Sequence, residues 1–131
     1  MKKIILDTNA YSNYFRGRPE LKELVEEVDE VIMSPIVIGE LIGGFKMGAR
    51  ENKNKSALTR FLGKPGVGVW DITMTTAEVY GEIMKSLRKK GKPIPTNDIW
   101  IAAQALENGA VLVTFDDKHF GEIDGLRVWE G

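Results

Sequence analysis

The stretch KKIILDTN, residues 2–9, decides the fold of the chain. Three consecutive apolar residues, Ile4 to Leu6, are typical of a buried strand, and the polar residues after them indicate a turn into a helix. Thr8 is expected to cap that helix, because a threonine hydroxyl can accept a hydrogen bond from a backbone N–H of the first turn. The sequence therefore opens with a strand that leads directly into a helix.

The same order of elements recurs along the chain. Short apolar runs predict further strands at 31–33, 67–72, 111–113 and 126–129. Helical spacing of apolar residues predicts helices that begin after Asp7 and at Pro19, helices over 35–47, 51–62 and 75–90, and one that is capped by Thr96 and ends at Gly109. Alternating strands and helices predict an α/β fold, with a mostly parallel central sheet and helices on both faces. The length, 131 residues, fits one domain spanning 1–131.

Composition removes several classes of chemistry. The chain has no cysteine and a single histidine, His119, which excludes disulfides, thiolate nucleophiles and zinc sites that need two or more histidines. His119 itself is expected in a loop, without a catalytic role. No apolar run is long enough for a signal peptide or a membrane span, so we expect a soluble cytoplasmic protein. The net charge of -1 neither favours nor excludes a nucleic acid.

Two acidic residues stand where a parallel sheet places its functional groups, and a third stands at the start of a helix. Asp7 directly follows the first strand, and Asp116 follows the strand at 111–113. Ligands bind beyond the carboxyl ends of the strands in such sheets. Asp98 lies in the first turn of a helix, where the helix dipole favours a negative charge. Taken singly, each of these residues can equally be a turn or capping residue.

Glu40 is the most informative acid. It lies in the middle of the predicted helix 35–47, with Ile36 and Val37 at positions i−4 and i−3 and two glycines at i+3 and i+4. A charge among such neighbours is expected to be costly unless it is paired or binds a metal. The glycines would allow another backbone or a substrate to approach closely.

Together the four carboxylates predict a site for a hard divalent cation. Carboxylates gathered without basic partners repel one another, and Mg²⁺ or Mn²⁺, which prefer oxygen ligands, would remove that repulsion. Such a metal can activate a water molecule and neutralise charge that develops on a phosphodiester. The composition is compatible with an RNA substrate, because 18 basic residues face 15 acidic ones once these four of the 19 acids are set aside.

Four short motifs resemble the PIN domain, and more closely the PIN-domain toxins of bacterial and archaeal VapBC toxin–antitoxin pairs. They occur in the family's order and span almost the whole chain. They are Leu6-Asp7-Thr8-Asn9, Ile38-Gly39-Glu40-Leu41, Thr96-Asn97-Asp98 with Ile101-Ala102-Ala103, and Val113-Thr114-Phe115-Asp116-Asp117-Lys118-His119-Phe120.

This resemblance implies a Rossmann-like α/β/α sandwich and an Mg²⁺- or Mn²⁺-dependent ribonuclease, together with a homodimer and a cognate antitoxin partner. It also implies that Asp7, Glu40, Asp98 and Asp116 carry the metal site. The polar residues Asn9 and Thr114 match supporting positions. Asn97 falls where some relatives have a further acid, and Asp117 could assist or replace Asp116.

Two clusters of basic residues offer candidate RNA contacts. Lysines and arginines gather between residues 46 and 64 and between residues 85 and 92, and the candidates among them are Lys46, Arg50, Lys53 and Arg88. Contacts to the RNA backbone are one interpretation. A solvated helix face is the other.

Three rival functions remain open at this point. A phosphatase of the haloacid dehalogenase type also places an aspartate after its first strand, but it needs a second acid where this chain has Asn9. A PIN-like nuclease of RNA processing outside a toxin–antitoxin system would share all four motifs. A non-catalytic module could use the carboxylates only to receive the arginines of a partner.

Overall fold

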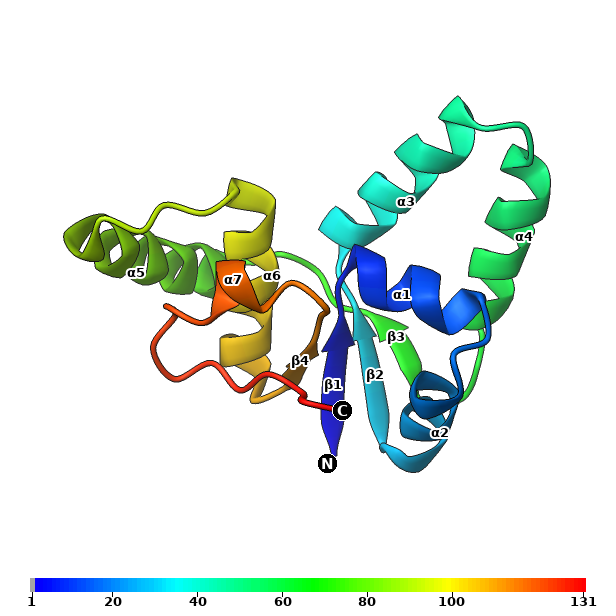
Figure 1. The fold of residues 1–131 in the computed structure, drawn as a ribbon, viewed down its shortest axis with the longest axis horizontal. Helices are drawn as coiled ribbons and strands as arrows, with labels where there is room; N and C mark the ends of the chain where they lie inside the picture. The colour runs from blue at the N-terminus through cyan, green and yellow to red at the C-terminus, as the bar shows by residue number, and fades with distance from the viewer. Residues whose placement is uncertain (1) are drawn as a thin grey trace.

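Four parallel strands form the centre of the molecule. A computed structural model describes residues 2–131, with the exception of the Asp117 side chain. The strands are β1 (Lys3–Leu6), β2 (Glu30–Met33), β3 (Val67–Val69) and β4 (Val111–Val113), in the order β3-β2-β1-β4. All three strand pairs are parallel, and Leu6 of β1 lies beside Val113 of β4. The predicted α/β class and parallel sheet are confirmed (Figure 1).

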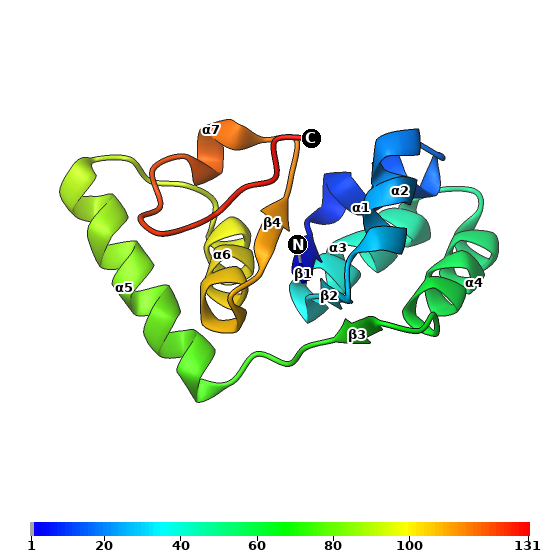
Figure 2. The same ribbon diagram turned by 90° about the horizontal axis from the view of Figure 1, so that it is seen from below.

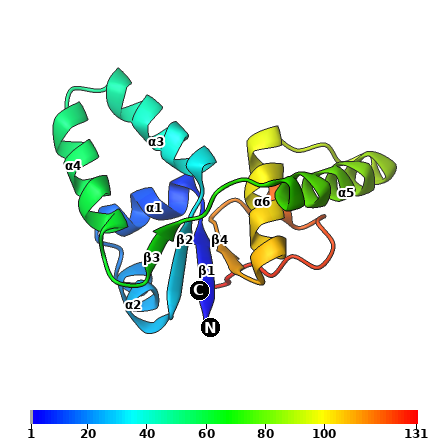
Figure 3. The same cartoon turned by 180° about the vertical axis from the view of Figure 1, so that it is seen from behind.

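Helices cover both faces of this sheet. They are α1 (Thr8–Phe15), α2 (Pro19–Glu27), α3 (Pro35–Met47), α4 (Glu51–Leu62), α5 (Met74–Lys90), α6 (Thr96–Asn108) and α7 (Asp117–Phe120). Figure 2 shows α1 to α4 on one side of the strands and α5 with α6 on the other. The chain moves from β1 outward to β3 and then returns past β1 to β4. Connections between parallel strands are right-handed, so this reversal of direction places the later helices on the opposite face of the sheet. Figure 3 shows the same two groups of helices from behind.

The core explains why the strands are continuous apolar runs. Ile4, Ile5 and Leu6 of β1 are fully buried, and so are Leu112 and Val113 of β4. Strands covered by helices on both faces have no side that meets water, so they do not alternate between apolar and polar residues. Each such side chain stabilises the fold by about 1.5–3 kcal/mol through burial.

Two helix caps differ from prediction. Asp7, not Thr8, caps α1, because its carboxylate accepts a hydrogen bond from the backbone N–H of Ala10 at 2.8 Å. Thr8 is the first residue of that helix, and its hydroxyl is therefore free to bond elsewhere. Thr96 is likewise the first residue of α6, where Pro95 takes the cap position without a side-chain hydrogen bond. Ser34 caps α3, because its hydroxyl accepts a hydrogen bond from the backbone N–H of Ile36 at 3.1 Å.

Two predicted strands are shorter than expected. β3 ends at Val69 instead of continuing to residue 72. The segment 126–129 makes only one parallel bridge, between Val128 and Leu112, so it is not a full strand. β4 is only three residues long and offers little backbone for further pairing. None of the helices within residues 2–131 combines the length and apolar character needed to cross a bilayer.

Candidate active site

Asp7 and Asp116 lie beyond the carboxyl ends of two adjacent strands. The backbone N–H of Asp7 donates to the carbonyl of Val113 at 3.2 Å, which ties the end of β1 to the end of β4. From β1 the chain first adds β2 and β3 on one side of the sheet and later adds β4 on the other side. The point between β1 and β4 is therefore where the order of the strands reverses. Open α/β sheets bind their ligands at such a point.

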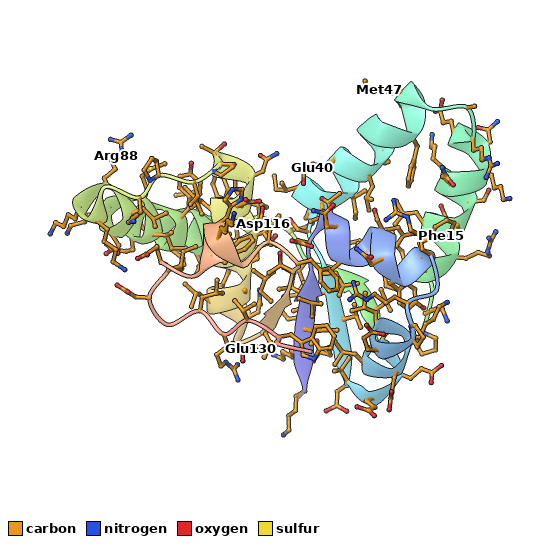
Figure 4. All side chains as sticks on the ribbon, in the orientation of Figure 1. Phe15, Glu40, Met47, Arg88, Asp116 and Glu130 are labelled. Atoms are coloured by element: carbon orange, nitrogen blue, oxygen red, sulfur yellow. The ribbon has the colours of Figure 1, made fainter. Side chains whose placement is uncertain are left out.

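All four acids predicted from sequence line one cavity there. Its volume is about 210 Å³, and its walls include Asp7, Glu40, Asp98 and Asp116 with Thr8 and Asn9. Figure 4 shows that Glu40 projects from α3 and Asp116 precedes α7, so the two carboxylates come from different parts of the fold. Residues far apart in sequence thus bring four acidic side chains to one opening.

Asp7 is the most buried of the four acids. Only 7% of it is exposed, and its carboxylate caps α1. Burial raises the pKa of Asp7 above its ordinary value, and the nearby Asp98 and Asp116 carboxylates raise it further. Hydrogen bonds from Thr114 and from the backbone N–H of Ala10 act in the opposite direction and lower this pKa. A bound cation would favour the charged form of this carboxylate, which burial otherwise disfavours.

Asp98 and Asp116 share a contact with the only histidine. Nδ1 of His119 lies 2.7 Å from Oδ2 of Asp98 and 3.1 Å from Oδ2 of Asp116. Burial raises the pKa of Asp98, while the hydrogen bond from His119 opposes that shift. The prediction that His119 lies in a loop is wrong, because the residue belongs to the single-turn helix α7. Its contacts with two of the four acids place it beside the cavity, and that it has no catalytic role stays a prediction.

Glu40 is held by two polar neighbours. The hydroxyl of Thr8 donates to its Oε1 at 2.7 Å, and Nδ2 of Asn97 lies 3.5 Å from its Oε2. Glu40 is exposed, while Val37 and Leu41 form the buried face of α3, so the cost expected for a charge among apolar neighbours does not arise. The charge of Glu40 is therefore solvated, and its position is set by hydrogen bonds.

No other part of the described chain packs closely against the two glycines near Glu40. A Cβ atom added at Gly43 or Gly44 would meet nothing within 4 Å. Both glycines are exposed on α3, so the expectation of a close neighbour there finds no partner among the described residues.

The supporting residues fall into three groups. Thr114 is buried, and its hydroxyl accepts from the backbone N–H of Asp116 at 3.0 Å, which fixes the loop that carries this acid. Asn9 lines the cavity, and Asn97 contacts Glu40. Asp117 begins α7, but its side chain lies outside the described residues.

The donor set suits a hard, hydrated cation. Within residues 2–131, the described His, Asp and Glu side chains contain no group of three already arranged around one metal position. Mg²⁺ keeps several of its waters and commonly uses only one or two carboxylates directly. An open cavity with four carboxylates has room for those waters and could supply the direct ligands. The absence of thiolates and the oxygen-rich lining favour Mg²⁺ or Mn²⁺ over softer metals.

The four basic candidates lie outside this cavity. Lys46 pairs with Glu51 at 3.0 Å, which places it at the junction of α3 and α4 together with Arg50 and Lys53. Figure 4 shows Arg88 on α5, on the opposite arm of the molecule. These residues therefore lie on two different arms of the molecule, and none of them lines the carboxylate cavity.

Comparisons with known proteins show the family of the chain. Residues 4–126 match the PIN domain. The chain belongs to the PIN-domain family. This PIN domain is 35% identical over 130 residues to "Ribonuclease VapC1" of Haemophilus influenzae, with 96% of this chain and 95% of the relative covered. It is 30% identical to the "tRNA(fMet)-specific endonuclease VapC" of Salmonella typhimurium, covering 98% and 97% of the two chains.

Solved structures extend the likeness to the whole fold. The VapBC-1 structure from nontypeable Haemophilus influenzae superposes with a TM-score of 0.86 at 31% identity, covering 97% of this chain and 96% of that one. The resemblance read from four short motifs, and the PIN-like fold that it implied, are confirmed.

Proposed function

We propose that this PIN domain is a metal-dependent ribonuclease, and that it acts in the cytoplasm as the toxin of a type II toxin–antitoxin pair. The observation that carries the proposal is the convergence of Asp7, Glu40, Asp98 and Asp116 on one cavity. The ribonuclease names of its relatives support the same reaction, and the VapBC complexes among its structural neighbours support the toxin role.

The acidic residues would hold one or two Mg²⁺ or Mn²⁺ ions. Such an ion supplies an activated water molecule and neutralises charge on the phosphate oxygens. Asp7, Asp98 and Asp116 are proposed as ligands or water positioners, because they line the cavity close to one another: His119 contacts both Asp98 and Asp116, and the charges of both raise the pKa of Asp7. Glu40 is proposed to bind metal or to orient water, since Thr8 and Asn97 fix its carboxylate at the mouth of the cavity.

The substrate is proposed to lie between the two arms of the molecule. Lys46, Arg50 and Lys53 would contact the phosphate backbone on the α3–α4 side, and Arg88 on the α5 side. Contacts of this kind add affinity without sequence information, and they weaken as the salt concentration rises.

An antitoxin segment is proposed to bind beside α1. A groove of about 240 Å³ lies there between α1, α3 and α4, with Phe15 and Phe45 among its walls. Phe15 is 47% exposed, although Tyr11 and Tyr14 of the same helix are buried. An apolar segment of a partner would cover this exposed ring. We further propose that the PIN domain forms a homodimer, as its resemblance to the toxins implies.

The test is cleavage of a mixed cellular RNA pool by the purified chain. The reaction contains Mn²⁺ or Mg²⁺, or a chelator, and the chain is compared with Asp7→Asn and with Asp29→Asn, a matched change at an exposed aspartate outside the cavity. Discrete, chelator-sensitive products that disappear in Asp7→Asn but persist in Asp29→Asn are expected. No cleavage by folded, antitoxin-free protein would favour a non-catalytic binding module. Cleavage without growth arrest on expression would favour an RNA-processing enzyme outside a toxin–antitoxin system.

A further inference from the structure

A second, larger cavity adjoins the carboxylates. Its volume is about 580 Å³, and its walls include Arg18, Thr114, Phe115 and Trp129. Phe120 lines both this cavity and the carboxylate cavity, so the two adjoin at this side chain. Thr114, which holds the Asp116 loop, also faces it. The larger cavity is therefore built onto the candidate active site.

The wall of this cavity contains flat side-chain groups, namely the guanidinium of Arg18 and the rings of Phe115 and Trp129. The guanidinium carbon of Arg18 lies 4.4 Å from the centre of the Phe115 ring, which is the distance of a cation–π contact. Phe115 is 39% exposed, and Trp129 is half-buried. Unpaired RNA bases are recognised by stacking on aromatic rings and on arginine planes. A volume of this size lies within the range of small-molecule pockets.

The charges of the wall favour a base over a phosphate group. Nε of Arg18 is paired with Oε1 of Glu20 at 2.8 Å, so the guanidinium has a neighbouring negative charge. Glu130 also lines the cavity. Two carboxylates would repel a phosphate, but they could accept hydrogen bonds from the N–H groups of a nucleobase.

We propose that this cavity binds an unpaired nucleobase of the RNA, next to the phosphodiester bond that is cleaved. This inference rests on the proposed ribonuclease function and deepens it. The scissile phosphate would lie at the carboxylates, and the neighbouring base would cross Phe120 and stack against Phe115 and Arg18. The cavity would thereby set the base preference at one position beside the cut.

The test uses a library of short single-stranded RNAs with random sequence, cleaved by the antitoxin-free chain in Mn²⁺. Sequencing of the products gives the base preference at each position around the cut. The variants are Phe115→Ala and Arg18→Ala, and the control is Arg16→Ala, which removes the same charge from an exposed arginine that does not line this cavity. Phe115→Tyr keeps an aromatic ring and serves as the conservative variant.

The wild type is expected to prefer certain bases at one position beside the cut. Phe115→Ala and Arg18→Ala should flatten that preference and raise KM by about fivefold or more, the range that loss of base stacking gives, with kcat changed little. Arg16→Ala and Phe115→Tyr should keep the preference. An unchanged profile and KM in both Phe115→Ala and Arg18→Ala would overturn the inference while leaving the ribonuclease intact.

A second measurement separates this inference from the ribonuclease proposal. The affinity for a labelled ten-nucleotide single-stranded RNA is measured by fluorescence anisotropy in chelator, where no cleavage can occur. Weaker binding by Phe115→Ala and Arg18→Ala than by Arg16→Ala supports the base site even if no cleavage is ever observed. Equal binding by all of these proteins overturns it. Loss of antitoxin binding with unchanged RNA binding would also overturn it, by showing that a protein partner uses this wall.

Discussion

Nδ1 of His119 lies 2.7 Å from Oδ2 of Asp98, and the same nitrogen is 3.1 Å from Asp116. The histidine thus joins two acids that would otherwise repel each other across the cavity. One N–H directed at two carboxylates reduces their repulsion in the metal-free protein. A divalent cation would seek the same oxygen atoms, so His119 and the metal compete for them.

Replacement of His119 by alanine tests this competition. Without the imidazole, Asp98 and Asp116 lose a partner that the metal would have to displace. We expect Mn²⁺ to bind up to about tenfold more tightly, which corresponds to the loss of one hydrogen bond to a charged group. The metal-free protein should be less stable by about 1 kcal/mol, since both groups are partly solvated.

Calorimetric titration with Mn²⁺, and thermal unfolding in chelator, measure these two quantities. His119→Gln is the second variant, because its amide can still donate a hydrogen bond. If Mn²⁺ binds more weakly to both variants than to the wild type, His119 orients the carboxylates for the metal and does not compete with it.

Asp7→Asn separates function from stability. Asparagine is as good a helix cap as aspartate, so the hydrogen bond to Ala10 should persist. Removal of the charge should reduce RNA cleavage on the order of 100-fold, equivalent to about 3 kcal/mol of transition-state stabilisation. In chelator at pH 7 the variant should be at least as stable as the wild type, because it no longer buries a charge. A lower melting temperature for Asp7→Asn than for the wild type would contradict this account.

The pH dependence of stability gives an independent check on Asp7. Burial raises the pKa of this carboxyl in the folded chain, so the native state holds a proton more firmly than the unfolded chain does. The free energy of unfolding of the metal-free protein should therefore fall as pH rises from the unfolded pKa, about 3.9, through the higher native pKa. Asp7→Asn should remove part of this decline. Urea unfolding in chelator at several pH values measures it, and an identical pH dependence in both proteins would exclude Asp7 as its source.

The contact between Thr8 and Glu40 predicts a role for a residue that is not an acid. The Thr8 hydroxyl donates to Oε1 of Glu40 at 2.7 Å. Thr8→Val keeps the shape of the side chain but leaves Glu40 free to turn, and we expect it to weaken metal affinity or reduce kcat by about tenfold, as loss of a supporting hydrogen bond commonly does. Thr8→Ser should retain both. Equal loss in Thr8→Ser and Thr8→Val would show that the methyl group matters and the hydroxyl does not.

Local patterns predicted the elements and the strand-end acids, because both depend on short-range rules. The bounds of α4, Glu51–Leu62, follow from its apolar spacing, and Asp7 and Asp116 follow from the rule for parallel sheets. The His119–Asp98 and Thr8–Glu40 contacts join residues 21 and 32 positions apart, which no local pattern encodes. The sequence predicts Thr8 as a helix cap, a role that leaves its hydroxyl no part in the site.

The final prediction concerns a polar residue in the core. Gln104 of α6 is fully buried, and its Nε2 donates to the carbonyl of Trp70 at 2.6 Å, which fixes the segment between β3 and α5 against α6. Its Oε1 has no hydrogen-bond partner among the described residues.

Gln104→Glu should destabilise the fold by about 3 kcal/mol at pH 7, because a buried carboxylate would face a carbonyl oxygen. Acidification should restore much of this loss, since a protonated glutamate can donate to Trp70, and the native state would then hold the additional proton. Gln104→Met, which cannot gain or lose a proton, should lose about 1–2 kcal/mol at every pH. Urea unfolding measures the free energy of unfolding of both variants from pH 4 to pH 8. If this free energy changes with pH by the same amount in Gln104→Glu and Gln104→Met, the donor to Trp70 does not determine the stability of the fold.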